Sequence, residues 1–159
     1  MFDREEIEAT LEEYVALREA IDAGLKPWTA LCNFYTEDCV YIDPAWGRIE
    51  GRESIREFMV ESMTGLEDWL FPVEFTAITG NDVAVKWLQI LPDKRSDGSS
   101  YVQTGWSRLV YAGNGLFRYQ EDTLNMGHVI EDLVSSGWRP GKGFKAPPSV
   151  PNRDFSIPR

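Results

Sequence analysis

The chain has 159 residues, which is enough for one domain with a substantial core. A hydrophobic content of 43% and an aromatic content of 13% argue against a disordered chain. The formal net charge of −10 argues against polyanionic partners, so we expect neither nucleic acid nor a membrane surface to bind.

The acidic N-terminus lacks the positive flank and apolar core of a secretory signal, and no apolar run approaches the ~20 residues that a membrane span needs. We therefore expect a cytoplasmic protein. In that compartment Cys32 and Cys39 are expected to be reduced core residues rather than a disulfide.

The first third of the chain has the apolar periodicity of helices. The predicted helices are residues 3–22, a second segment from Pro27 through Phe34, and a third that begins after Gly51 and carries Met63 on its inner face. Between the second and third helices, a short strand over residues 39–43 ends at a carboxylate.

From Trp69 onward the pattern changes to period two, which predicts strands. They are expected over residues 69–78, 83–91, 101–111 and 116–124. Pro72 marks an edge or a bulge in the first of them, and the glycines around Asn114 make a tight hairpin between the last two. Residues 127–137 have the pattern of a short final helix.

Helices followed by a meandering antiparallel sheet are the order of an α+β domain in which helices cover one sheet face. A curved sheet with helices on its concave side encloses a pocket. We expect one domain over residues 1–138, followed by a proline-rich tail over residues 139–159 that wraps a surface or is disordered.

The residue inventory favours acid–base chemistry without a cofactor. His128 is the single histidine, which argues against a multi-histidine metal centre, and no glycine-rich phosphate loop opens a helix. Side chains along a strand alternate between faces, so Tyr41 and Asp43 point the same way. A carboxylate on an apolar sheet face is costly without partners or a chemical role, which makes Asp43 the first catalytic candidate.

Four segments resemble the nuclear transport factor 2-like superfamily, specifically its SnoaL-like polyketide cyclase and ketosteroid isomerase branch. They are the helix end Phe34–Asp38, the strand end Asp43-Pro44, the helix start Gly51–Ile55 and the last hairpin reaching Glu121-Asp122. The resemblance covers residues 5–135 and implies a cone-shaped α+β barrel, in which a curved antiparallel or mixed β-sheet wraps around the N-terminal helices. This fold hosts isomerases, cyclases, dehydratases, epoxide hydrolases and non-catalytic binders.

The resemblance to ketosteroid isomerases implies roles for three positions. Asp43 takes the place of the general base, and Tyr14 is similar to the tyrosine that donates to the oxyanion. The second oxyanion donor of that family falls on Ser107, so the donor set is incomplete.

The resemblance also draws attention to the last strand. Asp122 matches the base of SnoaL-like cyclases and one aspartate of limonene-epoxide-hydrolase-like enzymes. In the hydrolases Tyr41 would stand for the water-positioning tyrosine, but the arginine and the second aspartate of their proton relay fall near Trp87 and Gln89. We therefore rank epoxide hydrolysis below proton abstraction.

Each acid also has a purely structural interpretation. Asp43 before Pro44 could simply start a turn by accepting backbone N–H bonds. Asp122 could pair with Arg118, two residues away on the same strand. Tyr14 could be a core aromatic residue, which is the commoner case on an amphipathic helix.

Side chains around the two acids are expected to bind the substrate. They are Tyr41, Trp46, Trp87, Gln89, Ser107, Arg18 and His128. Gln89 and Ser107 are expected donors to a substrate carbonyl. Arg18 either holds an anionic substrate or pairs with nearby acids, and His128 either shuttles protons or caps a helix.

Together these features predict an enzyme that removes a proton next to a carbonyl and stabilises the enolate of an apolar steroid-, polyketide- or aromatic-type substrate. Asp43 is the expected base and Asp122 the second acid/base group, with no metal and no cofactor. Isomerisation, cyclisation, dehydration or retro-aldol cleavage would follow from that step. The alternative is a non-catalytic small-molecule-binding or dimerisation module. The resemblance also implies a homodimer, packed through the sheet face that carries Trp106 and Arg108.

Overall fold

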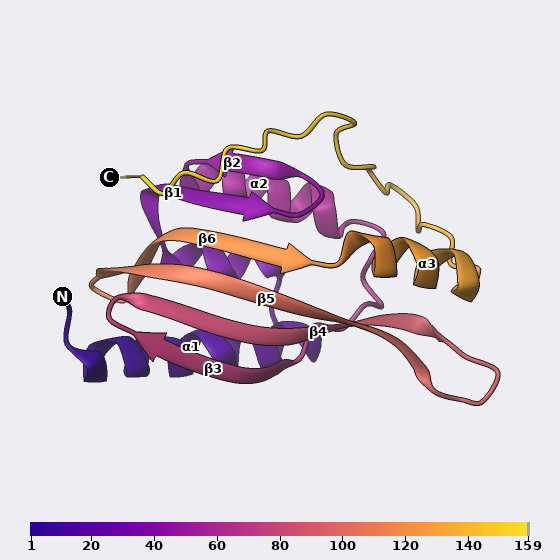
Figure 1. Cartoon of the computed structure of the whole chain (residues 1–159), viewed down its shortest axis with the longest axis horizontal. Helices are drawn as coiled ribbons and strands as arrows, with labels where there is room; N and C mark the ends of the chain where they lie inside the picture. Colours follow the sequence, from indigo (N-terminus) through magenta and orange to yellow (C-terminus); the bar gives the residue numbers. More distant parts are fainter. Residues whose placement is uncertain (159) are drawn as a thin grey trace.

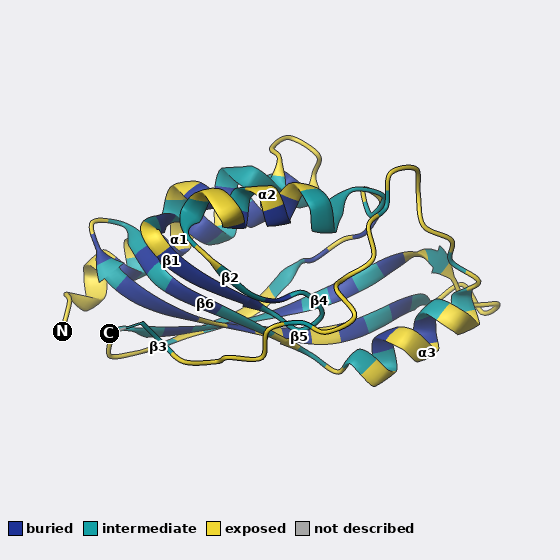
Figure 2. Ribbon diagram, turned by 90° about the horizontal axis from the view of Figure 1, so that it is seen from above, coloured by how far each residue is buried: buried dark blue, intermediate teal, exposed yellow. Residues whose placement is uncertain are grey.

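A six-stranded mixed sheet forms the centre of the molecule, and helices cover one of its faces (Figures 1 and 2). The computed structural model describes residues 1–158. Its elements are α1 (Arg4–Asp22), the 3-10 helix η1 (Trp28–Phe34), β1 (Tyr35–Asp43), β2 (Gly47–Glu50), α2 (Arg52–Met63), β3 (Val73–Thr79), β4 (Asp82–Lys94), β5 (Ser100–Gly113), β6 (Leu116–Leu124) and α3 (Met126–Ser136).

Helix α1 begins where the sequence provides a cap, because the Asp3 carboxylate accepts a hydrogen bond from the Glu5 backbone N–H at 3.0 Å. Its buried positions recur every three or four residues and include Ile7, Leu11, Tyr14, Arg18 and Ile21. The three predicted N-terminal helices are confirmed, the second of them as a 3-10 helix. Within residues 1–158, no helix combines the length and the apolarity that a membrane crossing requires.

The strand order is β2-β1-β6-β5-β4-β3, with β1 and β6 parallel and all other neighbours antiparallel. The predicted α+β class with a curved mixed sheet is confirmed. The sheet is open rather than closed into a barrel, because β2 and β3 form two separate edges.

Several strand predictions differ from the structure. β1 begins at Tyr35 rather than at residue 39, and β4 continues to Lys94 rather than ending at residue 91. Residues 47–50, expected in a loop, form the edge strand β2, which is too short to show a clear alternation in the sequence. β3 begins at Val73 rather than at Trp69, because Pro72 has no N–H to offer the ladder.

The main core lies between the sheet and the helices, where fully buried side chains include Tyr14, Tyr35 and Phe117. A smaller cluster lies on the opposite face of the sheet. It consists of Val40, Ile42, Val110 and Tyr119, with Ile157 of the C-terminal segment packed against it. The end of the chain therefore covers the sheet on the side that the helices leave open.

After α3 the chain crosses the molecule and returns to β1 and β2 (Figure 1). Asn152 forms a parallel bridge with Gly47. Arg48 then donates to the carbonyl oxygens of Asp154 and Ser156 at 3.2 and 2.7 Å. These backbone acceptors attach the tail to the edge of the sheet.

Replacing Gly47 by alanine is expected to loosen this attachment. Gly47 has a φ of +81°, and a Cβ there would lie 2.5 Å from the Asn152 carbonyl oxygen. Gly98→Ala is the matched control, because its φ is +84° and nothing lies within 4 Å of its Cβ position. We expect Gly47→Ala to lower the free energy of unfolding by about 1–3 kcal/mol more than the control does, measured by urea denaturation. Equal losses in the two variants would contradict a packed tail.

Candidate functional site

A cavity of about 430 Å³ lies between the sheet and the helices. Eight of the ten predicted site residues line it: Tyr14, Arg18, Tyr41, Asp43, Trp46, Trp87, Gln89 and Asp122. Aromatic side chains make up much of the remaining wall: Trp28, Phe58, Trp69, Phe71, Trp138 and Phe144. A mostly apolar wall with a few polar groups is typical of a small-molecule site.

Sheet pairing explains why residues distant in sequence meet here. β6 lies between β1 and β5, with Tyr41 opposite Gln120 and Ser107 opposite Asp122. Trp87 on β4 packs over Gly105, where a Cβ would lie only 2.4 Å from the indole ring. A glycine at that position therefore makes room for the indole on the cavity wall.

Three donors hold the Asp122 carboxylate in place. The Ser107 hydroxyl and the Gln120 amide donate to Oδ1 at 2.5 and 2.9 Å, and the Tyr41 hydroxyl donates to Oδ2. Burial raises the pKa of Asp122, while these hydrogen bonds and the charge of Arg18 oppose the shift. Asp122 is thus a half-buried carboxyl group with a fixed orientation.

The hydrogen bonds of Arg118 and Ser107 bear on two predictions made for β6 and β5. Arg118 donates to the Pro158 carbonyl oxygen, so the alternative that it pairs with Asp122 is wrong. Ser107 does not line the cavity. Its hydroxyl accepts from the Trp87 indole N–H at 2.9 Å and donates to Asp122, so it positions these two side chains instead of contacting a ligand.

Gln120 connects the parts of the site and is absent from the sequence-based prediction. Its amide nitrogen donates to Asp122 and, at 3.2 Å, to the Tyr41 hydroxyl. Its carbonyl oxygen accepts from the Tyr35 hydroxyl at 2.6 Å. Strand alternation was the available signal, because Gln120 lies two residues before Asp122 on the same face.

One oxygen of the Asp43 carboxylate holds a turn, and the other has no hydrogen-bond partner in the part of the chain that the structure describes. Its Oδ1 accepts from the backbone N–H groups of Ala45 and Trp46, both at 2.8 Å, so the turn interpretation is correct. Its Oδ2 accepts no hydrogen bond within residues 1–158, and the side chain lines the cavity. Burial raises the pKa of Asp43 to about 6; the two N–H groups oppose this shift, and the charge of Asp122 adds to it.

Tyr14 and Arg18 reach the cavity from α1. The Tyr14 hydroxyl is 3.4 Å from the Gln120 carbonyl oxygen, which Tyr35 already occupies at 2.6 Å. Arg18 Nη1 lies 3.5 Å from the same Tyr14 hydroxyl. Burial raises the pKa of Tyr14, so the phenol stays protonated near neutral pH. Because its present contacts are long and weak, its O–H can turn to a ligand.

The structure bears on two predictions at the other end of the cavity, for Gln89 and His128. The Gln89 amide N–H donates to Gln103 at 2.9 Å, and Gln103 donates to the Asp132 carboxylate at 2.6 Å. This chain of hydrogen bonds uses one of the two N–H groups of Gln89 and leaves its other N–H and its carbonyl oxygen without a partner within residues 1–158, so its expected role as a donor to a substrate carbonyl stays a prediction. His128 does not line the cavity; its half-exposed ring lies 3.2 Å from the buried Asp132 carboxylate.

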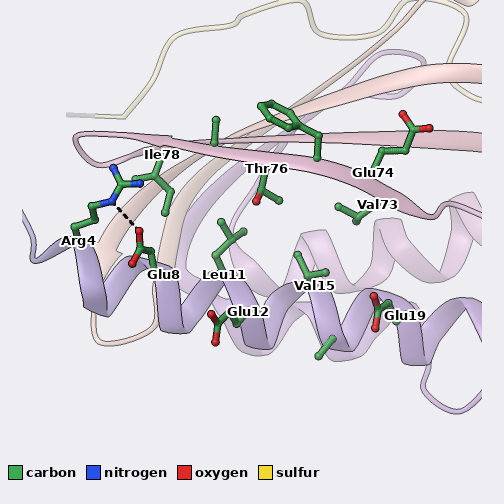
Figure 3. A pocket seen from close by; sticks show the side chains of 13 residues that line it. Arg4, Glu8, Leu11, Glu12, Val15, Glu19, Val73, Glu74, Thr76 and Ile78 are labelled. Carbon is green, nitrogen blue, oxygen red and sulfur yellow. Dashed lines mark hydrogen bonds and ion pairs between the residues drawn. The ribbon is translucent and has the colours of Figure 1, made fainter.

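A second hollow, of about 540 Å³, is larger but lined by none of the predicted residues (Figure 3). It lies between α1 and the edge strand β3, where Leu11 and Val15 approach Val73 and Ile78. Within residues 1–158, no three His, Cys, Asp or Glu side chains are grouped closely enough to hold a metal ion. We place the candidate site in the smaller cavity, because Asp43 and Asp122 line it.

Fold and site together define an α+β domain whose apolar cavity holds two carboxyl groups. The SnoaL-like domain family matches residues 11–118, which is more than half of the chain, and the protein belongs to this family. The family resemblance expected from the sequence is thereby confirmed. No curated protein matches the chain.

Several solved structures share the fold. A protein from Jannaschia sp., assigned as a SnoaL-like polyketide cyclase, is 18% identical over 83% of this chain and 96% of its own, with a TM-score of 0.63. A protein from Catenulispora acidiphila with a ketosteroid isomerase-like fold, in complex with trimethylamine, is 20% identical over 80% of this chain and 98% of its own, with a TM-score of 0.60. An NTF2-like protein from Anabaena variabilis is 12% identical over 79% of this chain and 93% of its own, with a TM-score of 0.59. At these identities the likeness concerns the fold alone.

Proposed function

We propose that this protein is a cofactor-independent acid–base enzyme that removes a proton next to the carbonyl of an apolar small molecule. The observation that carries the proposal is the pair of carboxyl groups in one apolar cavity. One of them, Asp43, has a free oxygen and a pKa raised to about 6, while the other, Asp122, is held by three donors. A general base is most effective when its pKa lies near the working pH.

In the proposed step, Asp43 Oδ2 takes a proton from the carbon next to the carbonyl. The C–H electron pair forms the carbon–carbon double bond of an enolate, and the carbonyl π electrons move onto oxygen. The Tyr14 hydroxyl donates to that oxygen, with Arg18 behind it at 3.5 Å. One such donor is worth ~3–4 kcal/mol of transition-state stabilisation. Return of the proton to another carbon gives isomerisation, and attack of the enolate on a second carbonyl gives cyclisation.

Proton exchange tests this step without knowledge of the natural substrate. We expect the protein to speed the exchange of the α-protons of 2-tetralone, an aromatic ketone, for deuterium in D₂O, followed by NMR. Because Asp43 must be ionised, the rate should rise with pH through an apparent pKa of about 6 and then level off. A rate equal to that in buffer, or a profile without this rise, would contradict the proposal.

A non-catalytic binding module is the second candidate, and the hydrogen-bond pattern around the cavity supports it. Ser107 and both N–H groups of Gln120 are occupied by protein partners, so few donors are left for an oxyanion. A binder should hold apolar ligands yet leave the exchange of 2-tetralone at the rate in buffer. The exchange experiment therefore separates the two candidates.

We also propose that the protein forms a homodimer through the sheet face opposite the helices. Phe75 and Trp106 are 52% and 42% exposed there, with their ring centroids 6.2 Å apart. Trp106→Glu is expected to convert a dimer to a monomer in size-exclusion chromatography with light scattering. Val134→Glu, at a 78% exposed position on α3, is the control that should stay dimeric. A monomeric wild type, or a dimeric Trp106→Glu variant, would contradict this interface.

A further inference from the structure

Arg18 is a buried cation without a carboxylate partner. The residue is 5% exposed, and within residues 1–158 no carboxylate oxygen lies within 4.0 Å of its guanidinium. Buried charges in proteins are normally paired, because an isolated one loses its hydration without compensation. The charges of Asp122 and Asp22 act on this arginine only from beyond 4.0 Å, so its need for an anion in direct contact is unmet.

The hydrogen bonds of Arg18 leave most of the guanidinium unused. A guanidinium has five N–H donors. Nη2 donates to the Phe71 carbonyl oxygen at 3.0 Å, and Nη1 lies 3.5 Å from the Tyr14 hydroxyl. The buried Nε has no partner. Three donors thus remain, which is enough for the two parallel bonds that a carboxylate accepts.

The two cavity acids do not meet this need. Both oxygens of Asp122 already accept from Ser107, Gln120 and Tyr41, and Asp43, although its Oδ2 is free, forms no ion pair with the guanidinium within 4.0 Å. Asp22, one turn after Arg18, is likewise occupied, since its carboxylate accepts from the Phe71 N–H at 3.0 and 3.1 Å.

Aromatic rings flank the guanidinium. Its central carbon lies 5.4 Å from the centroid of the Trp28 ring and 5.9 Å from that of Trp87. Both rings line the cavity, so a flat group bound at Arg18 would lie between or against indoles. The surroundings of the charge thus suit an apolar ring better than a hydrated sugar or phosphate chain.

We infer that the ligand of this cavity is an apolar ring compound bearing a carboxylate or a similarly acidic oxygen, which binds the Arg18 guanidinium while its ring lies against Trp28 and Trp87. This assignment names the substrate class of the proposed enzyme. It requires only the cavity and the unpaired cation, and it holds for a binding module as well.

Two probes of matched shape test it. The carboxylate 2-naphthoate and the neutral 2-naphthamide differ in charge but hardly in size. Quenching of tryptophan fluorescence, checked by calorimetry, should show that the wild type binds 2-naphthoate at least ~10-fold more tightly, the size of one charge-assisted contact. The preference should disappear in Arg18→Gln and be partly retained in Arg18→Lys, which keeps the charge but not the fork of N–H groups. Arg4→Gln is the control, because that arginine lies exposed on the same helix, pairs with Glu8 and does not line this cavity, so its loss should leave the preference unchanged.

Equal affinity of the wild type for the two probes, or no binding of either, would overturn the inference, and this result does not depend on whether a variant folds. A preference that survives in Arg18→Gln would also overturn it. The proposed function fails separately: if 2-naphthoate is preferred through Arg18 but 2-tetralone does not exchange, the ligand class stands and catalysis does not. Exchange of 2-tetralone without a preference for the anion would support catalysis and overturn the ligand class.

Discussion

Asp43→Asn is expected to lower the rate of α-proton exchange by about 10²–10⁴-fold, the usual contribution of a general base. The asparagine oxygen can still accept the backbone N–H groups of Ala45 and Trp46, so the turn and the fold should persist. What is lost is the oxygen that receives the proton. Asp38→Asn is the matched control, because Asp38 lies exposed on the same strand and should leave the rate unchanged. Wild-type kinetics in Asp43→Asn would remove this residue from the mechanism.

The same variant should change how stability depends on pH. The pKa of Asp43 is about 6 in the folded protein and near 3.8 in an unfolded chain. Between these values the folded state binds more protons, so this group makes the free energy of unfolding decrease as pH rises through that window. In Asp43→Asn this contribution should be absent, so the free energy of unfolding should decrease less over that window than it does in Asp38→Asn, measured by urea denaturation at a series of pH values.

Asp122→Asn is expected to lower the exchange rate to a similar extent, by about 10²–10³-fold, if Asp122 is the second acid/base group. It should also reveal electrostatic coupling between the two carboxyl groups. The charge of Asp122 raises the pKa of Asp43, so its removal should move the rise of the pH–rate profile below about 6.

Glu121→Gln controls for this second prediction. Glu121 is the neighbour of Asp122 on β6, and its carboxylate accepts from Tyr119 on the opposite face of the sheet. This variant should keep both the rate and the profile of the wild type. A profile of Asp122→Asn that rises at the wild-type pH would show that the two carboxyl groups are not coupled.

Alternation along the strands predicted much of this site. Because alternate side chains of a strand share one face, Tyr41 is correctly expected on the same face as Asp43, and Trp87 on the same face as Gln89. This expectation needs no knowledge of which strands are neighbours. The helical stripe of α1 likewise placed Tyr14 inward, because its burial follows from spacing within a single element. Predictions of this kind depend on local geometry alone.

Contacts between distant strands could not be predicted in this way. Tyr35 and Gln120 are 85 residues apart, and only the insertion of β6 beside β1 brings their side chains together. The orientation of the Gln89 amide depends on Gln103 of β5, whose own amide is held by Asp132 of α3. An amide can donate or accept in either direction, so its role is set by partners that no local pattern reveals.

The parallel pairing of β1 with β6 has a consequence for biogenesis. The β1–β2 hairpin is synthesised well before β6. Until β6 emerges from the ribosome, the edge of β1 that will pair with it stays unpaired. Such late, long-range docking is slow compared with hairpin closure. A nascent chain that stalls before Leu116 would thus expose this unpaired strand edge and would lack Asp122.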